Sequence, residues 1–374
     1  MHFDYVVVGA GFTGATLAER LATTKNAKVL VVERRDHIGG NAYDEYNEHG
    51  ILVHRYGPHI FHTNSDKVWQ YLSKFTEWRP YQHRVLGNIE GKLVPIPFNL
   101  DSLHQLFPAA MAERLEDKLV SYYGFGSKVP ILKLRQTKDE ELQYLANYVY
   151  KNVFEGYTRK QWGLDPEQLA PSVTARVPIL ISRDDRYFQD TYQAMPKYGY
   201  TALFRNMLAH PNIHLLLNTD YKEVFSDITC TGTYHTGPID EYFNYIHGQL
   251  PYRSLRFEWS TQPEEQVQTV GTINYPTQYD FTRITEQKHL TGQSNPFSTL
   301  IREFPETYEP GQNDPYYPIP RDETRGIYAK YKEEMKRLEG NVYFCGRLGD
   351  YQYYNMDQAV ARALTIAENN SGLD

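Results

Sequence analysis

Cysteine is scarce in this chain: Cys230 and Cys345 are the only two in 374 residues. Two cysteines so far apart predict no disulfide framework and favour a reducing compartment, the cytoplasm. The sequence also lacks an apolar run long enough to span a membrane, so we expect no membrane insertion. A strand-like stretch begins within the first residues, and it leaves no room for a signal peptide.

Positive charge is not in excess either. Lys and Arg number 39 against 46 Asp and Glu, which gives a formal net charge of −7. This balance argues against a general nucleic-acid-binding or anionic-membrane surface, but it permits a local basic pocket for an acidic ligand. We find no internal repeat and no low-complexity tract, and the length predicts two or three domains.

Tyrosine, in contrast, is abundant, with 32 residues. Its flat apolar face and hydroxyl suit packing around a large polar ligand. A Tyr-rich surface or subunit interface explains the same composition, and composition alone does not separate the two.

The most informative stretch is a glycine motif near the start, where Val6–Val8 predicts a buried strand that runs into Gly9-x-Gly11-x-x-Gly14 and a helix. The first glycine allows a tight turn, the second lets the backbone approach a pyrophosphate, and the third lets helix and strand pack closely. Phe12 and Thr13 complete the turn. The pattern predicts a dinucleotide site; a glycine turn in another α/β unit is the alternative.

The next predicted strand, 28–33, ends in Glu33, followed by Arg34. This is the position, roughly 20 residues beyond the last glycine, where a carboxylate accepts from an adenosine ribose hydroxyl. Gly39-Gly40-Asn41 then opens a backbone loop of the kind that covers the pyrophosphate in flavin-binding relatives of the dinucleotide fold. The segment therefore favours FAD over NAD.

His59 and His62 are three residues apart, a spacing that could bind metal. No Cys or nearby acid completes a tetrahedral set. We predict no metal and a core or cofactor-contacting role for the pair.

Periodicity predicts helices over 65–80 and through most of 102–168, and a hairpin over 81–93 that turns at Gly87-Asn88 or Glu90-Gly91 and is broken by 95–99. A mobile loop is expected over 169–186. Three apolar stripes define the helical segment: Leu103/Leu106/Phe107, Leu115/Leu119/Tyr122 and Leu142/Leu145/Ala146/Val149.

Later segments read as a helix at 203–208, strands at 214–218 and 341–347, antiparallel strands over 253–302 and a helix at 357–368. The predicted fold class is α/β, with an FAD-binding Rossmann-like domain built from discontinuous segments, a helical-bundle insert and an antiparallel β-sheet domain. The expected boundaries are 1–80, 200–240 and 335–374 for the first, 102–168 for the second, and 81–101 and 169–199 with 241–334 for the third.

Several motifs occur together in one order along nearly the whole chain: Asp36-His37-Ile38-Gly39-Gly40-Asn41, Gly57-Pro58-His59-Ile60-Phe61-His62-Thr63, Gly156-Tyr157-Thr158-x-Lys160-Gln161-Trp162, Asp185-x-Tyr187-Phe188, Tyr252-Arg253-Ser254-Leu255, Thr282-Arg283-Ile284-x-Glu286, Pro315-Tyr316-Tyr317-Pro318 and Gly346-Arg347-Leu348-Gly349. In these motifs the sequence resembles the bacterial UDP-galactopyranose mutases.

The resemblance implies an isomerase that interconverts UDP-galactopyranose and UDP-galactofuranose, a precursor of cell-surface glycans, with FAD active in its reduced form. In the family the flavin acts as a nucleophile. It attacks the anomeric carbon and displaces UDP; a flavin–sugar iminium, ring contraction and re-addition of UDP follow. A cytoplasmic homodimer is typical of the family.

The resemblance also assigns residues. Arg176 and Arg283 would bind the diphosphate, Tyr157 would stack on uracil and Trp162 would lie beside the sugar. The implied substrate-binding set is Phe154, Tyr157, Thr158, Gln161, Trp162, Arg176, Tyr187, Arg253, Asn274, Arg283, Tyr317, Tyr353 and His83. The implied catalytic set is Arg176, Arg283, His62, Tyr353 and Asn355. The cofactor-binding set is Gly9, Gly11, Phe12, Thr13, Gly14, Glu33, Arg34, Gly40, Asn41, Tyr56, His59, Gly346, Arg347, Tyr353, Asn355 and Met356.

One residue departs from the family pattern: Asn355 stands where the family usually has Asp, so the shape is kept but the charge and one acceptor are lost. Other functions stay open on the sequence. They are a mutase for a 2-acetamido or 6-deoxy nucleotide sugar, a flavin amine oxidase or dehydrogenase, and a non-catalytic nucleotide-sugar binding protein.

Overall fold

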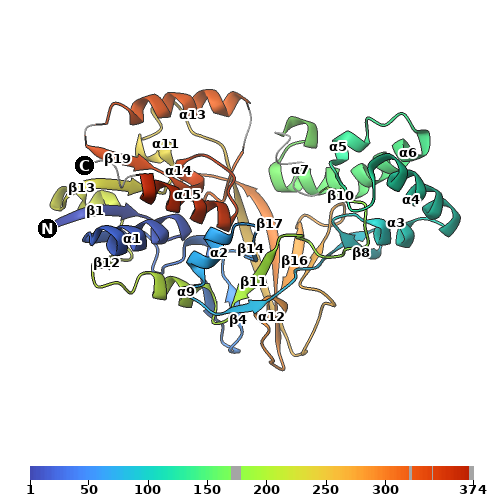
Figure 1. Ribbon diagram of the computed structural model, residues 1–374, viewed down its shortest axis with the longest axis horizontal. Helices are drawn as coiled ribbons and strands as arrows, with labels where there is room; N and C mark the ends of the chain where they lie inside the picture. The colour runs from blue at the N-terminus through green and yellow to red at the C-terminus, as the bar shows by residue number, and fades with distance from the viewer. Residues whose placement is uncertain (170–177, 320–321, 339, 370–374) are drawn as a thin grey trace. The chain divides into compact units, whose positions relative to one another are not determined.

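The computed structural model describes residues 1–169, 178–319, 322–338 and 340–369 (Figure 1). The chain forms two compact units. The first comprises Met1–Tyr81, Asp190–Tyr252 and Asp314–Asp374, and the second comprises Gln82–Gln189 and Arg253–Asn313. Each unit is thus assembled from segments distant in sequence.

The first unit is built on a parallel five-stranded sheet. Its strand order is β12 (Ile213–Leu216), β2 (Val29–Val32), β1 (His2–Val8), β13 (Thr229–His235) and β19 (Asn341–Phe344). Every residue of β2 is buried, as expected for the Val/Leu-rich strand of a sheet covered on both faces.

The C-terminal segment returns to the N-terminal one, which confirms the predicted discontinuous domain. Helix α15 (Met356–Asn369) packs on α1 (Phe12–Lys25) in the first unit (Figure 1). Gly346 makes this return possible: its φ is +84°, and a Cβ there would lie 2.9 Å from Thr13 Oγ1.

The other elements of the first unit are short, apart from the 14-residue helix α13 (Asp322–Met335). They are η1 (Gly40–Ala42), β3 (Asp44–Tyr46), β4 (Leu52–His54), β5 (Phe61–Thr63), α2 (Asp66–Leu72), β6 (Trp78–Pro80), β11 (Tyr192–Pro196), α9 (Tyr200–Met207), α10 (Tyr221–Val224), η4 (Phe225–Asp227), α11 (Ile239–Tyr242), β18 (Tyr317–Pro318), α13 (Asp322–Met335) and α14 (Gly346–Gly349).

The helix predicted over 65–80 is wrong in its second half. Helix α2 ends at Leu72, and β6 pairs with β11. Pro80 disfavours a helical conformation for the residue before it. In addition, Trp78 stacks on Trp69 and on Phe61, with ring centroids 4.7 and 4.9 Å apart.

The second unit contains the predicted helical segment. Its elements are α3 (Leu100–Leu106), α4 (Ala109–Tyr123), β9 (Lys128–Val129), α5 (Ile131–Leu134), α6 (Glu140–Val149), the π-helical turn η2 (Tyr150–Glu155), α7 (Gly156–Trp162), η3 (Pro166–Gln168) and β10 (Ile179–Leu180). Asn99 and Asp139 cap the N-termini of α3 and α6 with their side chains. The predicted apolar stripes meet in one core, except that Tyr122 is exposed.

A mostly antiparallel sheet completes this unit. Its strands run in the order β14 (Tyr252–Gln262), β17 (Ser298–Thr307), β16 (Arg283–Glu286), β15 (Thr272–Asn274), β7 (Val85–Ile89) and β8 (Lys92–Ile96), and α12 (Gln287–Thr291) follows β16. The β7–β8 hairpin turns at Glu90-Gly91, where both φ values are positive. Pro95 does not break the hairpin as predicted, because edge strand β8 tolerates it.

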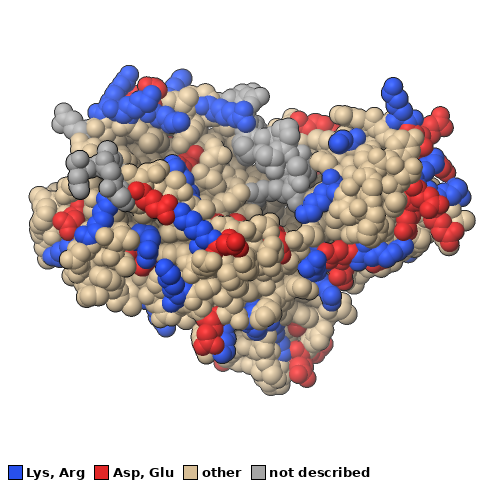
Figure 2. All heavy atoms as spheres, viewed as in Figure 1, with Lys and Arg blue, Asp and Glu red and all other residues tan. Residues whose placement is uncertain are grey.

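Charge is unevenly spread although the chain is acidic. Figure 2 shows Lys and Arg gathered over α13, where Lys330, Lys332 and the following Lys336 are exposed. Among the described residues, no helix combines the length and apolar character needed to cross a membrane.

Candidate functional site: a dinucleotide cavity and an aromatic cavity

The glycine motif connects β1 to α1 as predicted. Gly9 has φ +102°, and a Cβ on Gly14 would lie 1.9 Å from the carbonyl oxygen of Gly9. Only glycine therefore allows helix and strand to approach so closely. The N-cap residue is Gly11, which has no side chain to occupy the first N–H groups of α1. Those N–H groups and the helix dipole favour a phosphate.

Glu33 stands at the end of β2 beside this turn. Its Oε2 accepts from the Ala10 N–H at 2.8 Å, and its Oε1 accepts from the Arg35 N–H at 3.0 Å. Each carboxylate oxygen keeps a second lone pair, so the acid can still accept from a ribose hydroxyl as the sequence predicts.

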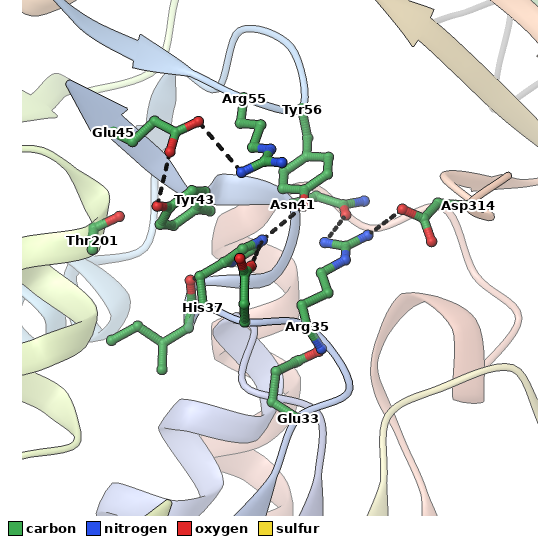
Figure 3. Close-up of polar contacts among 12 residues, drawn as sticks. Glu33, Arg35, His37, Asn41, Tyr43, Glu45, Arg55, Tyr56, Thr201 and Asp314 are labelled. Carbon is green, nitrogen blue, oxygen red and sulfur yellow. Dashed lines mark hydrogen bonds and ion pairs between the residues drawn. The ribbon is translucent and has the colours of Figure 1, made fainter. Parts of the chain in front are cut away.

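The loop after β2 is tied to a distant segment through Arg35, which the sequence analysis did not single out (Figure 3). Its guanidinium donates to Asn41 Oδ1 at 3.0 Å and to Asp314 Oδ2 at 2.9 Å, and it lies 4.2 Å from the centre of the Tyr56 ring. Burial acts to lower the pKa of Arg35, but the surrounding groups, with Asp314 first among them, together outweigh burial and hold the pKa above its usual range. The cation is therefore permanent and fixes Asn41.

Histidine and tyrosine rings hold the other side of the loop. His37 stacks on Tyr43 at 3.8 Å, and its Nε2 lies 2.7 Å from the Tyr56 hydroxyl. Tyr56 thus contacts both Arg35 and His37 rather than the cavity described next (Figure 3). Burial lowers the pKa of His37, which keeps the ring neutral near pH 7.

These loops enclose a cavity of about 230 Å³ in the first unit. Thirteen of the sixteen predicted cofactor residues line it: Gly9, Gly11, Phe12, Thr13, Gly14, Glu33, Arg34, Gly40, Asn41, His59, Gly346, Arg347 and Met356. Tyr56, Tyr353 and Asn355 are the other three; within the described residues they do not belong to its lining.

The residues of this cavity fit a dinucleotide. Gly11 and Gly40 meet face to face, since a Cβ on Gly40 would lie 3.0 Å from the Gly11 Cα. The helix N-terminus suits the pyrophosphate, Glu33 suits a ribose, and the second glycine loop closes over the groove between them.

The two predicted histidines differ in their contacts. His59 lines the dinucleotide cavity, and its Nδ1 lies 2.8 Å from the carbonyl oxygen of Gly57. His62 Nδ1 lies 3.0 Å from Asp190 Oδ2, and Asn64 donates to the other oxygen of the same carboxylate at 2.7 Å. Asp190 orients His62, yet no spacing in the sequence indicated it. The described residues contain no cluster of three or more His, Cys, Asp or Glu suited to a metal.

Arg347, Tyr317 and Tyr353 lie together in the first unit. The guanidinium of Arg347 donates to the Tyr354 carbonyl at 2.7 Å and lies 5.4 Å from the Tyr317 ring, and the rings of Tyr317 and Tyr353 are 5.1 Å apart. Asn355 stands immediately before α15 and accepts from the Ala359 N–H through its carbonyl. Its place at a helix start suits Asn and Asp equally.

A second cavity, of about 100 Å³, lies within the second unit. Six predicted substrate residues line it: Phe154, Tyr157, Thr158, Trp162, Tyr187 and Asn274. Helix α7 and the π-helical turn before it supply four of these, and the spacing of Phe154, Tyr157 and Thr158 places them on one helical face. Aromatic walls of this kind suit a flat base.

Asn274 and Arg283 face each other across β15 and β16 as direct partners. The Arg283 guanidinium pairs with Glu303 on β17, from Nη2 to Oε2 at 2.8 Å. Glu303 is 1% exposed. An acid inside the apolar pattern of β17 was the signal that could have revealed this pair.

Lys160 and Arg253 hold main-chain groups in place. Lys160 Nζ donates to the carbonyls of Tyr275 and Gln278 at 2.7 and 2.8 Å, and Arg253 donates to those of Gln161 and Lys160 at 2.9 and 3.1 Å. The structure therefore gives Arg253 a supporting role for the end of α7, and the substrate contact predicted for it stays a prediction. Burial lowers the pKa of Lys160 to about 8.

Three further residues were predicted to bind substrate: His83, Gln161 and Arg176. The carbonyl of His83 accepts from the Tyr187 N–H at 2.7 Å, and the two rings are 5.9 Å apart. Gln161 is buried. Arg176 and the rest of 170–177, within the loop predicted over 169–186, lie outside the described residues, whereas Ile179–Leu180 form strand β10.

The fold and the first cavity together define a flavoprotein of the Rossmann-like class. A family model described as an NAD(P)-binding Rossmann-like domain matches residues 7–75, and one described as UDP-galactopyranose mutase matches residues 152–353. The chain belongs to the UDP-galactopyranose mutase family. It is thus an enzyme, an isomerase, and FAD is its cofactor.

Curated relatives match along the full length. The chain is 35% identical to the probable UDP-galactopyranose mutase of Klebsiella pneumoniae, covering 98% of this chain and 94% of the relative. It is 34% identical to the dTDP-fucopyranose mutase of Escherichia coli, covering 97% of each.

Solved structures share the fold at lower identity. A reduced UDP-galactopyranose mutase superposes with a TM-score of 0.73 at 17% identity, covering 100% of this chain and 95% of that chain. A putative protoporphyrinogen oxidase from an Exiguobacterium species gives a TM-score of 0.64 at 14% identity, with 99% of each chain covered.

Proposed function

We propose that this enzyme interconverts UDP-galactopyranose and UDP-galactofuranose. One observation carries the proposal: in the second unit Tyr157, Trp162 and Asn274 line one aromatic cavity, and Asn274 is the direct strand partner of Arg283. An aromatic wall followed by a cation is the arrangement that a uracil base followed by a diphosphate requires.

Arg283 is the residue that we assign to the diphosphate. Its ion pair with Glu303 uses Nε and Nη2, both directed at Oε2, and the side chain of Arg283 remains 26% exposed. A guanidinium suits phosphate oxygens through bidentate hydrogen bonds, and its charge offsets the charge that grows on UDP as the bond to the sugar breaks. Arg176 is proposed as the second cation on the strength of the family resemblance.

In the first unit the residues serve the cofactor. Gly9 to Gly14 and Gly39 to Asn41 bind the pyrophosphate, Arg35 fixes Asn41, and Asp190 holds His62 in one orientation. Reduced FAD, when bound, supplies a nucleophilic ring nitrogen for the anomeric carbon. We assign to His62 a role in tuning the reactivity of the flavin, with its ring oriented by the contact of Nδ1 with Asp190.

A substrate panel tests this function. Dithionite-reduced enzyme should convert UDP-galactofuranose to UDP-galactopyranose, and chromatography measures the conversion. Arg283→Ala should lower kcat/KM by roughly 30- to 1000-fold, because one charge-assisted contact is lost. A dTDP-linked 6-deoxy sugar is the competing substrate. Faster turnover of that sugar would replace the proposed substrate, and unchanged kinetics of Arg283→Ala would remove this arginine from the site.

A homodimer and a cytoplasmic location are also proposed, on the family resemblance. Light scattering at several protein concentrations tests the first, since a dimer predicts about twice the mass of one chain.

A further inference from the structure

His235 is the last residue of β13, and it lines the dinucleotide cavity without belonging to any motif singled out in the sequence. It is 3% exposed. Among the described residues, neither Nδ1 nor Nε2 of its ring has a hydrogen-bond partner. Two polar atoms are thus buried at the wall of a cavity without a regular hydrogen bond to any described residue.

Such atoms require an explanation, because nearly all buried polar groups in native proteins are hydrogen-bonded and an unpaired one destabilises the fold. Burial lowers the pKa of His235 to about 4; the backbone of Gly237 lies near the ring and opposes this effect without forming a regular hydrogen bond. The ring is therefore neutral at pH 7 and carries one N–H donor and one acceptor nitrogen.

His235 lies at the adenosine end of the cavity. The Thr219 N–H donates to the carbonyl of Glu33 at 3.1 Å, so the segment that leads to Tyr221 is joined to the end of β2, and Glu33 and Tyr221 line the same cavity. The rings of Tyr221 and Tyr242 lie 4.9 and 5.2 Å from the His235 ring, and both tyrosines line the same cavity.

We propose that His235 hydrogen-bonds the adenine ring of FAD, and that Tyr221 and Tyr242 are the aromatic walls of that subsite. Adenine presents an amino donor next to ring-nitrogen acceptors, which matches the single donor and single acceptor of a neutral imidazole. His235 is thus a determinant of FAD affinity. The inference rests on FAD as the cofactor and is independent of the sugar substrate proposed above.

The test uses apoprotein prepared by removing the flavin. His235→Phe keeps an aromatic ring but removes both nitrogens, His235→Gln restores a donor and an acceptor, and His214→Phe is the matched control on exposed β12 of the same sheet. FAD and FMN are titrated by flavin fluorescence, and unfolding of the apoprotein is followed in urea.

The proposal predicts that His235→Phe changes FAD affinity and apoprotein stability in opposite directions. His235→Phe should weaken FAD binding roughly 10-fold, the value of a hydrogen bond or two, while the apoprotein becomes equally or more resistant to urea. The FAD affinity of His235→Gln should stay within about 3-fold of the wild-type value. FMN affinity should not change in any variant, because FMN lacks adenosine.

Three results would overturn the proposal. An unchanged FAD affinity in His235→Phe would mean that a buried water satisfies the ring instead. Weaker FAD binding together with a less stable apoprotein would assign His235 a packing role. An equal loss of FMN and FAD affinity would place the ring away from adenine. If His235→Phe does not fold, His235→Leu takes its place with the same criteria.

Discussion

Arg283 and Glu303 are direct partners across β16 and β17, and the guanidinium directs Nε and Nη2 at the same carboxylate oxygen, at 2.9 and 2.8 Å. The other oxygen of Glu303 is buried without a hydrogen bond to any described residue. The acid therefore fixes the orientation of the arginine that we assign to the diphosphate.

The first prediction concerns the negative charge of Glu303. Glu303→Gln should lower kcat/KM about 10-fold and reduce the unfolding free energy by about 1–3 kcal/mol, because it weakens a charge-assisted bond to a buried partner. Steady-state kinetics and urea unfolding measure the two effects.

Glu306→Gln is the matched control on the same strand. Glu306 pairs with Arg256, and the two side chains are 38% and 45% exposed. An exposed ion pair contributes little, so this variant should change stability by less than about 1 kcal/mol and leave turnover unaltered. Equal effects of the two substitutions would show that Glu303 does not position Arg283.

The second prediction concerns the second glycine loop. Gly40→Ala would introduce a Cβ 3.0 Å from the Gly11 Cα at a φ of +55°, which should separate the two cofactor loops. We expect FAD to bind at least about 10-fold more weakly, measured as bound flavin absorbance per chain and by titration.

Gly50→Ala is the control that separates the effect of backbone strain from the effect of the contact between Gly40 and Gly11. Gly50 also has a positive φ, +71°, but a Cβ there meets nothing within 4 Å. Its substitution should cost about 1 kcal/mol of stability without changing FAD affinity. Equal loss of flavin in both variants would contradict the assigned role of the Gly11–Gly40 contact.

A third prediction follows from His54, which is 1% exposed and accepts from the His59 N–H at 3.0 Å. Burial lowers its pKa to about 4, below the ordinary value of 6.5. Between these two values the unfolded chain binds more protons than the native protein, so stability falls as the pH drops through this window.

His54→Asn retains an acceptor but does not titrate. Its loss of unfolding free energy between pH 7.5 and 5 should be about 2 kcal/mol smaller than in the wild type, as the pKa difference requires. The exposed His214→Asn should follow the wild-type profile. An unaltered pH dependence in His54→Asn would mean that His54 is protonated in the native state.

The sequence predicts best what depends on neighbouring residues. Val6–Val8, the three glycines and Glu33 lie within one βαβ unit, so their local pattern determines both strand pairing and cavity. The late strand at 341–344 was also predicted, because its apolar run ends on a glycine and a helix follows.

Contacts between distant segments could not be predicted in this way. The donors of Arg253 are taken by carbonyls of residues 160 and 161, a consequence of how α7 meets β14. Trp78 joins a ring stack that includes Tyr192, and this overrides the helical periodicity of 65–80. Nothing near His235 in the sequence shows that its nitrogens are left unpaired.

The most direct test of the account compares two oxidation states of one preparation. The rate of conversion of UDP-galactofuranose to UDP-galactopyranose is measured with the bound FAD fully oxidised and then after reduction with dithionite. Because the reaction needs an electron-rich ring nitrogen and no net redox change, we predict turnover at least about 100-fold faster in the reduced enzyme. Equal rates in the two states would contradict the proposed chemistry.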